Sequence, residues 1–321
     1  MLSHSDYLSL IEAQIAELNL PKAPAGLYEP ISYTLAGGGK RLRPTLTLAA
    51  CDAFCGEPRR ALFQAMAVEM FHNFTLLHDD VMDRADMRRG RPTVHVKWDD
   101  RTAILSGDAM LTLASMLLSH DAPADRLPQL MRVFNRTAME IYEGQQLDMD
   151  FESRQDVTVG EDLEMIRLKT SVLLGCACAL GAIVGGAEQE SVDAIYSFGE
   201  KLGLAFQLQD DYLDTFGDPI VFGKEIGGDI SNDKKTWLLI TAAAEDRSGV
   251  IARELATPSE REEKIAAVTG VYRELKLNER IHELIDSYVA EAIRQLDRAA
   301  LRPAALEFFS ALAEKSRTRS N

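Results

Sequence analysis

The chain has 321 residues, of which 46% are apolar, and it carries a net charge of −15 at pH 7. This length and apolar content allow one large domain or two ordinary ones with a substantial core. The negative charge argues against a nucleic-acid ligand and against electrostatic attachment to anionic membranes. Apolar residues occur throughout and no low-complexity block is present, so the acidity does not indicate disorder.

The N-terminal residues and the four cysteines indicate a soluble protein of a reducing compartment. Residues 1–6 lack the basic and apolar regions of a signal peptide. The cysteines have neither zinc-ribbon spacing nor a histidine in a ligand pattern, so we interpret them as small core residues. The longest uncharged stretch, residues 171–187, predicts a buried core helix rather than a membrane span. We therefore expect a cytoplasmic protein with no membrane span.

Helical periodicity dominates the chain. Apolar residues recur at spacings of three and four over residues 61–78, 127–149, 195–213 and 281–296. Glycine and proline mark the loops, at residues 21–24, 37–39, 56–58, 122–128, 185–186 and 217–228. No stretch shows strand alternation bounded by hairpin turns, and no break resembles a flexible linker. The pattern predicts a single all-α domain over residues 1–321.

The first candidate binding element is a glycine-rich turn before a predicted helix. Residues 37–44 read Gly-Gly-Gly-Lys-Arg-Leu-Arg-Pro. Glycine lets a backbone approach an anion closely, and the arginine fork matches phosphate oxygens. The turn alone is equally typical of a solvated surface loop.

Two copies of an acidic signature end long apolar helical runs. They consist of Asp79, Asp80 and Asp83, and of Asp210, Asp211 and Asp214. In each copy the first and last carboxylates lie one turn apart on a helix face. Glycine and proline follow both copies, which indicates helix C-termini, where the helix dipole disfavours anions. Six carboxylates so placed need cations, and hard oxygen ligands suit Mg²⁺.

Basic residues follow both acidic groups. Arg88 and Arg89 belong to an Arg-Arg-Gly-Arg-Pro-Thr segment after the first group. Lys224, Lys234 and Lys235 follow the second. An acidic trio followed by cations suits a metal-bridged phosphate, whereas two solvated acidic helix ends would leave these cations unexplained.

Two further positions are weaker candidates. Lys169 and Thr170 lie within a predicted helix, where a surface lysine is the plain alternative. His72 precedes Asp79 by seven residues, about two helical turns, and so occupies the same face.

The combination of carboxylates and phosphate-binding cations restricts the chemistry. A Walker loop, the kinase signature and a Gly-x-Ser-x-Gly elbow do not occur in the sequence. A diphosphate leaving group fits, because metal ions neutralise the charge that develops as the C–O bond ionises. The remaining carbocation needs a dry apolar cavity, which helices rich in Leu, Met and Phe supply.

These motifs together resemble the trans-isoprenyl diphosphate synthases, or polyprenyl synthetases, from Gly37 to about Trp237. The matching segments are Gly-Gly-Lys-Arg-Leu-Arg-Pro; Leu-Leu-His-Asp-Asp-Val-Met-Asp with Arg-Arg-Gly-Arg-Pro-Thr; Leu-Lys-Thr; and Phe-Gln-Leu-Gln-Asp-Asp-Tyr-Leu-Asp with Gly-Lys and Gly-Gly-Asp. The resemblance implies an all-α isoprenoid synthase fold, a single bundle of roughly a dozen helices around a central cavity. It also implies a Mg²⁺-dependent prenyltransferase. Such an enzyme condenses isopentenyl diphosphate head-to-tail with an allylic diphosphate (dimethylallyl, geranyl or farnesyl) and releases diphosphate.

The resemblance assigns roles to individual residues. Asp79, Asp83 and Asp210 would bind about three Mg²⁺ ions, with Asp80, Asp211 and Asp214 completing the clusters directly or through water. The allylic diphosphate would contact Arg88, Lys169, Lys224 and Lys234. Isopentenyl diphosphate would contact Lys40, Arg43, His72 and Arg89. Thr170 and Gln207 would stabilise the developing cation, and the released diphosphate would act as the base. The candidate catalytic residues are Asp79, Asp80, Asp83, Lys169, Thr170, Gln207 and Asp210.

Product length depends on the residues below the first acidic group. Phe74 and Thr75 lie five and four residues before Asp79, about one helical turn below it. A bulky Phe74 would form a floor, although ordinary core packing also explains it. The two-residue spacer Val81-Met82 departs from the four-residue spacer of typical bacterial farnesyl synthases and is shared with archaeal-type enzymes. We favour geranylgeranyl diphosphate as the product, with farnesyl diphosphate next and a longer polyprenyl diphosphate as an alternative.

Three rival functions remain at this point. A terpene cyclase of the same fold would need only one such acidic motif and no isopentenyl diphosphate site. A non-catalytic partner subunit usually loses one motif, and a helical scaffold would not need the Arg and Lys placement. The resemblance also implies a homodimer, with the apolar stretches around residues 106–110 as a candidate interface.

Overall fold

The computed structural model describes residues 1–217 and 226–317. By its internal contacts the chain divides into two compact units. Unit 1 comprises Met1–Asn135, Cys176–Tyr196 and Ala299–Ala305. Unit 2 comprises Arg136–Gly175, Ser197–Arg298 and Leu306–Asn321.

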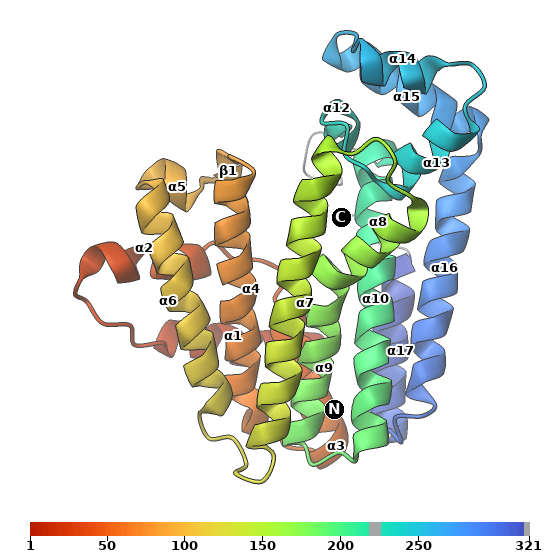
Figure 1. The fold of residues 1–321 in the computed structure, drawn as a ribbon. Helices are drawn as coiled ribbons and strands as arrows, with labels where there is room; N and C mark the ends of the chain where they lie inside the picture. The colour runs from red at the N-terminus through yellow and green to blue at the C-terminus, as the bar shows by residue number, and fades with distance from the viewer. Residues whose placement is uncertain (218–225, 318–321) are drawn as a thin grey trace. The chain divides into compact units, whose positions relative to one another are not determined.

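Helices form nearly all of the regular structure in the described residues, which confirms the all-α prediction (Figure 1). The helices are somewhat more numerous than the predicted dozen, because single-turn helices such as α5 (Val94–Lys97) and α12 (Gly228–Ser231) were not visible in the periodicity. The expectation of no strand was wrong in one place. Strands β1 (Met87–Arg88) and β2 (Arg91–Pro92) pair antiparallel, a ladder too short to leave an alternating pattern.

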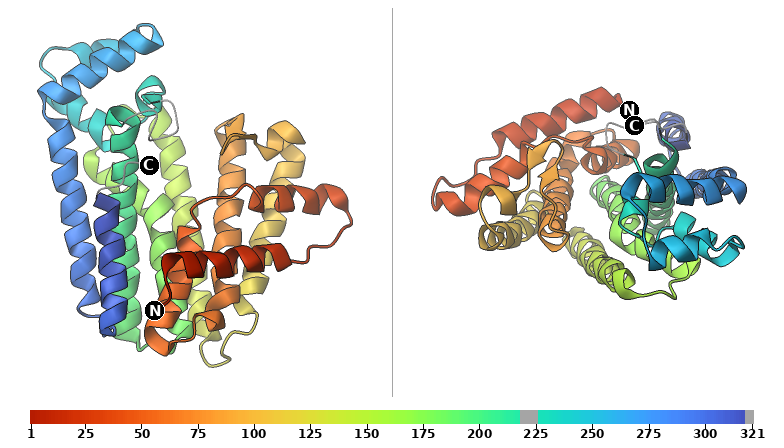
Figure 2. Two further views of the ribbon diagram at one scale, coloured as in Figure 1. Left: turned by 180° about the vertical axis from the view of Figure 1, so that it is seen from behind. Right: turned by 90° about the horizontal axis from the view of Figure 1, so that it is seen from above.

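Unit 1 is built around a pair of long helices, α4 and α6, that lie side by side (Figure 1). Its helices are α1 (His4–Glu17), α2 (Ala25–Leu35), α3 (Leu42–Cys55), η1 (Pro58–Ala61), α4 (Leu62–Met82), α5 and α6 (Asp100–Ser119), with parts of α7 (Leu127–Ser153), α9 (Val172–Val184) and α10 (Gln189–Phe216). Helix α1 crosses α3 and α4 (Figure 2). Glycine permits a close approach within the pair, since a Cβ at Gly107 of α6 would lie 2.2 Å from the His78 ring of α4.

Unit 2 combines the second acidic group with the C-terminal helices. It holds the rest of α7, α9 and α10, together with α8 (Val159–Ile166), η2 (Arg167–Ser171), α12, α13 (Trp237–Glu245), α14 (Val250–Ala256), α15 (Arg261–Glu274), α16 (Leu277–Leu296) and most of α17 (Pro303–Arg317). Phe198 of α10 and Phe309 of α17 are fully buried and pack edge to face, with ring centroids 5.4 Å apart.

Both acidic groups lie at helix C-termini, as the sequence predicts. Helix α4 ends at Met82, and Arg84 follows in the left-handed conformation with φ 54°. The Ala85 amide then donates to the Asp80 carbonyl at 3.0 Å, which closes a Schellman-type end. Helix α10 ends at Phe216, two residues after Asp214, the last aspartate of the second group.

Two helical segments of the described residues are long and apolar enough to span a membrane by length and composition alone, Asp100–Ser119 and Val159–Val184. The second is 83% buried within the structure, so it is a core helix, as predicted for residues 171–187. In the first segment only 33% of the residues are buried, because α6 exposes apolar side chains on one face.

Candidate active site

Polar side chains follow one side of α4 toward its C-terminal end. At 3.6 residues per turn, these side chains fall within a sector of about 120°. They are Glu69, His72, Asn73, Asp79, Asp80 and Asp83. Glu69, Asn73 and Asp80 are buried, whereas Asp83, which caps the helix, is exposed. One helix face therefore presents carboxylates at its end and buried polar groups below them.

Arg88 of β1 bridges the first two aspartates. Its Nε donates to Asp80 Oδ1 at 2.7 Å, and a terminal nitrogen lies 3.6 Å from Asp79 Oδ2. Burial raises the pKa of Asp80, and the charge of Arg88 opposes that rise without cancelling it. The structure thus brings a predicted phosphate-binding cation together with two predicted metal ligands.

A tight hairpin presents the arginines. Arg89 and Gly90 both have positive φ, 52° and 71°, as the two central residues of a type I′ turn require. Thr93 closes the hairpin, because its hydroxyl donates to the Ala85 carbonyl at 2.7 Å and its amide donates to the Asp86 carbonyl at 3.0 Å. The short ladder therefore holds Arg88 and Arg89 next to the end of α4.

The backbone of the glycine-rich turn contacts the Arg89 side chain. The Arg89 guanidinium donates to the Gly38 carbonyl, and a Cβ at Gly39 would lie 2.9 Å from the Arg89 Cζ. Gly39 also has φ 128°, which only glycine adopts readily. Glycine at position 39 thus serves two needs, the turn conformation and the space for Arg89.

The three cations of this turn have different environments. Lys40 is exposed and Arg43 is half-buried, but Arg41 is only 4% exposed. Arg41 donates to Glu69 at 2.6 Å, to Glu12 at 2.9 Å and to the Leu35 carbonyl at 2.7 Å. Arg41 is therefore a support of the turn, and Lys40 and Arg43 remain as the substrate-facing candidates.

His72 is held as a neutral acceptor. Its Nε2 lies 3.2 Å from a terminal nitrogen of Arg43. Burial first, and then the positive charges of Arg43, Arg89 and Arg88, lower the pKa of His72 well below its usual value. Because an arginine can only donate, Nε2 accepts and the ring proton belongs on Nδ1.

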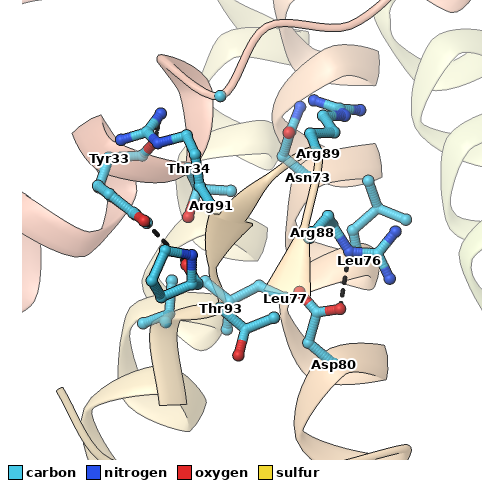
Figure 3. A pocket seen from close by; sticks show the side chains of 13 residues that line it. Tyr33, Thr34, Asn73, Leu76, Leu77, Asp80, Arg88, Arg89, Arg91 and Thr93 are labelled. Carbon is cyan, nitrogen blue, oxygen red and sulfur yellow. Dashed lines mark hydrogen bonds and ion pairs between the residues drawn. The ribbon is translucent and has the colours of Figure 1, made fainter. Parts of the chain in front are cut away.

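A pocket in unit 1 is lined by some of these groups, among them Asp80, Arg88 and Arg89, as Figure 3 shows. Lys40, Arg43, His72 and Asp79 do not line it. Its empty volume, including space open to solvent, is about 420 Å³. It is lined by Tyr33, Thr34, Gly37, Asn73, Leu76, Leu77, Asp80, Arg88, Arg89, Arg91, Pro92, Thr93 and Val94. The Asn73 amide nitrogen donates to Glu69 at 2.9 Å. Three arginines around a mostly apolar hollow form a site suited to an anion that carries an apolar group.

Unit 2 contains the second set of predicted residues. Lys169 lies in the π-helical segment η2 and its Nζ is 2.6 Å from Asp148 Oδ2 on α7. Thr170 donates to Gln207 Oε1 at 3.4 Å, and Gln207 Nε2 donates to Asp211 Oδ1 at 3.0 Å. A π-helical turn shifts the register of the helix, so Lys169 and Thr170 both reach partners here instead of solvent.

Asp214, the third aspartate of the second group, accepts a hydrogen bond from a backbone amide. Asp214 Oδ2 accepts from the Asp229 amide at 2.9 Å, at the start of α12. Asp229 in turn lies 3.4 Å from Lys234 Nζ. This places Asp214, Asp229 and Lys234 in one cluster, whereas Lys224 lies outside the described residues.

Burial dominates the electrostatics of this cluster. It raises the pKa of Asp211 to about 7, with Asp229 adding to the rise and Lys234 opposing it. Asp162 of α8 is 1% exposed, and its Oδ2 has no hydrogen-bond partner. Burial and the charge of Asp211 raise the pKa of Asp162 well above its usual value. A nearby divalent cation stabilises the ionised form of such buried carboxyls more than it stabilises that of exposed ones.

The donor set fits Mg²⁺ but does not form a closed cage. In the described residues no three His, Cys, Asp or Glu side chains already converge on one metal position. Mg²⁺ usually binds one or two carboxylates and completes its octahedron with water and substrate phosphates. Carboxylate pairs at helix ends, beside phosphate-binding cations, match that open coordination.

Sequence reasoning missed several residues of these clusters, namely Glu69, Asn73, Asp148, Asp162 and Asp229 as partners of the motif residues. A signal existed for Glu69 and Asn73, since their spacing to Asp80 keeps them on one face of α4. Asp148 lies 21 residues from Lys169 on another helix, and no local pattern relates them.

The chain-length candidates lie in different surroundings. Phe74 is 6% exposed and packs edge to face on Phe71 and His78, with centroids 5.4 Å and 4.8 Å away. The Thr75 hydroxyl donates to the His72 carbonyl at 2.8 Å. Five residues rotate a helix by about 140° beyond a full turn, so Phe74 is angularly farther from Asp79 than Thr75 is.

The fold and these side chains define an all-α synthase for diphosphate substrates. The polyprenyl synthetase family model matches residues 24–275, most of the chain, so the chain belongs to this family. It is a prenyltransferase that makes short-chain prenyl diphosphates.

Individual relatives support the same assignment. The chain is 40% identical to a geranylgeranyl diphosphate synthase of Methanosarcina mazei, over 90% of this chain and 89% of that protein. It is 38% identical to a geranylfarnesyl diphosphate synthase of Natronomonas pharaonis, over 81% of each chain. A crystal structure of a geranylgeranyl pyrophosphate synthase matches with a TM-score of 0.95 and 42% identity, covering 100% of both chains.

The contact between Gly39 and Arg89 generates a test. Gly39→Ala introduces a Cβ where the Arg89 guanidinium lies, so we expect the KM for isopentenyl diphosphate to rise about tenfold. The KM for the allylic substrate should stay within about twofold. Steady-state kinetics with each substrate varied in turn measures this difference.

The control is Gly38→Ala in the same turn. Gly38 also has positive φ, 73°, but a Cβ there meets nothing within 4 Å. Both variants should lose some thermal stability, and only Gly39→Ala should lose isopentenyl diphosphate affinity. An equal change of KM in the two variants would contradict the proposed contact.

Proposed function

We propose that the protein condenses isopentenyl diphosphate with an allylic diphosphate to give geranylgeranyl diphosphate and diphosphate. The observation that carries this proposal is the end of α4, where two aspartates share Arg88 beside an arginine-lined pocket. A carboxylate group next to phosphate-binding cations is what a metal-bridged diphosphate requires.

The proposed metal ligands are the two acidic groups. Asp79, Asp83 and Asp210 bind about three Mg²⁺ ions, and Asp80, Asp211 and Asp214 complete the coordination directly or through water. Arg88, Lys169, Lys224 and Lys234 bind the allylic diphosphate. In support, Arg88, Lys169 and Lys234 each lie within 3.6 Å of a carboxylate oxygen, so all three already face acidic groups.

Isopentenyl diphosphate is assigned to the cations of unit 1. Lys40, Arg43 and Arg89 supply the positive charge, and neutral His72 accepts from Arg43 at Nε2 and keeps an N–H donor at Nδ1. A neutral imidazole avoids one more positive charge among four arginines, which supports its role as an orienting group.

The chemistry is ionisation followed by carbon–carbon bond formation. When bound, Mg²⁺ neutralises the charge that develops on the leaving diphosphate. Thr170 and Gln207 present oxygens toward the allylic carbon and stabilise its positive charge. Their mutual hydrogen bond, and that of Gln207 to Asp211, supports a fixed orientation for both. The released diphosphate removes the final proton, so no side-chain base is required.

The remaining proposals concern the whole protein. We propose one functional domain over residues 1–321 and a cytoplasmic location. We also propose a homodimer through α6. Ser106, Gly107 and Met110 of the expected interface are buried within the protomer. Exposed apolar side chains on the same helix, Leu105 at 59% and Met116 at 63%, lie about three turns apart on one face of α6 and support an interface along that face.

The elongation assay tests the proposed reaction. Purified protein with Mg²⁺, isopentenyl diphosphate and farnesyl diphosphate should release diphosphate and form a twenty-carbon product by mass analysis. Failure to elongate any allylic primer from five to fifteen carbons would remove the proposal.

Asp79→Ala and Asp210→Ala should each lower kcat/KM at least about 100-fold with unchanged helical circular dichroism. Asp125→Ala, at a side chain 80% exposed, is the control.

A second prediction concerns product length. Phe74→Ala removes a large ring next to Phe71 and His78, and we expect products longer than those of the wild type. Chromatography of the dephosphorylated products measures the distribution. Phe309→Ala is the control, because it removes an equally buried ring far along the sequence and should lower stability by about 3–5 kcal/mol without lengthening the product. An unchanged distribution in Phe74→Ala would place the floor at other residues.

A third prediction concerns the oligomer. Leu105→Glu with Met116→Glu places two charges on the exposed apolar face of α6, so the sedimentation coefficient should fall to that of a monomer. Leu306→Glu, at another exposed apolar side chain, should leave the dimer intact. A wild-type protein that sediments as a monomer at micromolar concentration would contradict the dimer.

A further inference from the structure

A buried lysine outside every motif of the sequence lies on α15. Lys264 is 4% exposed, and its Nζ is 2.7 Å from Asp233 Oδ1 and 3.5 Å from the Ser231 carbonyl. A lysine is rarely buried unless it is paired, because desolvation of its charge is unfavourable. Such an ion pair often stabilises a protein no more than apolar side chains of similar volume would. Its effect on the position of the nearby backbone is therefore more informative than its effect on stability.

The segment that Lys264 contacts is fixed at its other end as well. Gly227, with φ 78°, packs so closely on α15 that a Cβ there would lie 2.6 Å from Ile265 Cδ1. The Gly227 amide donates to the Asp214 carbonyl, and the Asp229 amide donates to the Asp214 carboxylate. Residues 227–233 are therefore held at the start by α10 and Ile265 and at the end by Lys264.

This segment carries two side chains of the second cluster. Asp229 and Lys234 face each other at 3.4 Å, and the Lys234 amide donates to the Asp229 carbonyl at 3.0 Å. Lys234 directly follows Asp233, which has the left-handed φ of 52°. A displacement of Asp233 would therefore move the backbone from which Lys234 extends.

We propose that Lys264 is a positioning residue for the allylic diphosphate: its ion pair with Asp233 fixes the backbone that presents Lys234 and Asp229. The proposal rests on the proposed function, in which Lys234 binds that diphosphate. Binding groups must be held to about half an ångström by their supports, and a misplacement of about 1 Å lowers rates up to 100-fold.

Two simpler roles for Lys264 make different predictions. If its charge merely attracted the diphosphate through space, then removing the negative charge of Asp233 would strengthen binding. If the pair only stabilised the fold, then both substrates would be affected alike. Positioning alone predicts that loss of either partner weakens allylic binding and leaves isopentenyl diphosphate binding unchanged.

The experiment compares Lys264→Met, Asp233→Asn and the double variant in the full-length protein with Mg²⁺. Asparagine tolerates the left-handed conformation, and the Asp233 side chain is 35% exposed, so this variant should fold even if Lys264→Met does not. We expect each single variant to raise the KM for farnesyl diphosphate about tenfold and that for isopentenyl diphosphate less than twofold. The double variant should be no worse than the singles, because both remove one interaction.

Lys201→Met is the matched control. Lys201 of α10 pairs with Glu291 of α16 at 3.3 Å, away from residues 227–233 in sequence, and its loss should leave both KM values unchanged. A lower farnesyl diphosphate KM in Asp233→Asn would overturn the proposal, as would equal changes for both substrates. An inactive wild type would instead refute the proposed function.

Discussion

The structure depends on holding like charges close together next to helix ends. The helix dipole disfavours carboxylates at a C-terminus, yet α4 ends in Asp79, Asp80 and Asp83. Arg88 offsets this by contacting two of the three carboxylates from a hairpin. The arginines repel one another in the same way, and buried Glu69 lies among them as the opposite charge. Opposed charges of this kind let an anion site exist before the anion binds.

Backbone conformation fixes where these charges lie. Arg41, Arg84, Arg89 and Asp233 all have positive φ, which non-glycine residues adopt at a cost of about 1–2 kcal/mol each. Each lies in a turn next to a motif: before α3, after α4, in the hairpin and after α12. Because the regular elements are helices, these turns are the positions where the chain can redirect a side chain. Three other non-glycine residues of the described chain, Asp121, Lys276 and Ala300, have positive φ in turns away from the motifs, so four of the seven such residues lie next to proposed binding groups.

The sequence predicts the helices and the motif residues well, because both leave local signals. The period of three and four gives α4, α7, α10 and α16 to within several residues, and the acidic groups lie at helix ends as their glycine and proline neighbours indicate. The partners of those residues leave no such signal. Lys169 of η2 contacts Asp148 of α7, and Lys264 of α15 contacts Asp233 in the turn after α12. Thr170 depends on a π-helical turn, and the ladder at Arg88 and Arg91 is two residues long. These contacts arise from tertiary packing, which single-sequence patterns do not encode.

The cations of the described ion pairs fall into two classes by burial. The cations proposed to bind substrate, Arg88, Lys169 and Lys234, have side chains 35%, 25% and 41% exposed. The pairs of Lys169 and Lys234 have carboxylates 25% and 22% exposed and resemble surface ion pairs, which are worth about 0–1 kcal/mol and can exchange a carboxylate for a phosphate at little cost. Arg88 also contacts buried Asp80, although its own guanidinium is partly exposed. The supporting cations Arg41 and Lys264 are 1% and 5% exposed. Breaking a pair that is buried on both sides, such as Arg41 with Glu69, costs about 3–5 kcal/mol, so it stays in place while the exposed pairs rearrange. Lys264 is buried although its partner Asp233 is partly exposed, and a buried lysine also remains with its partner. Burial therefore separates the cations that can rearrange with substrate from those that keep the backbone in place.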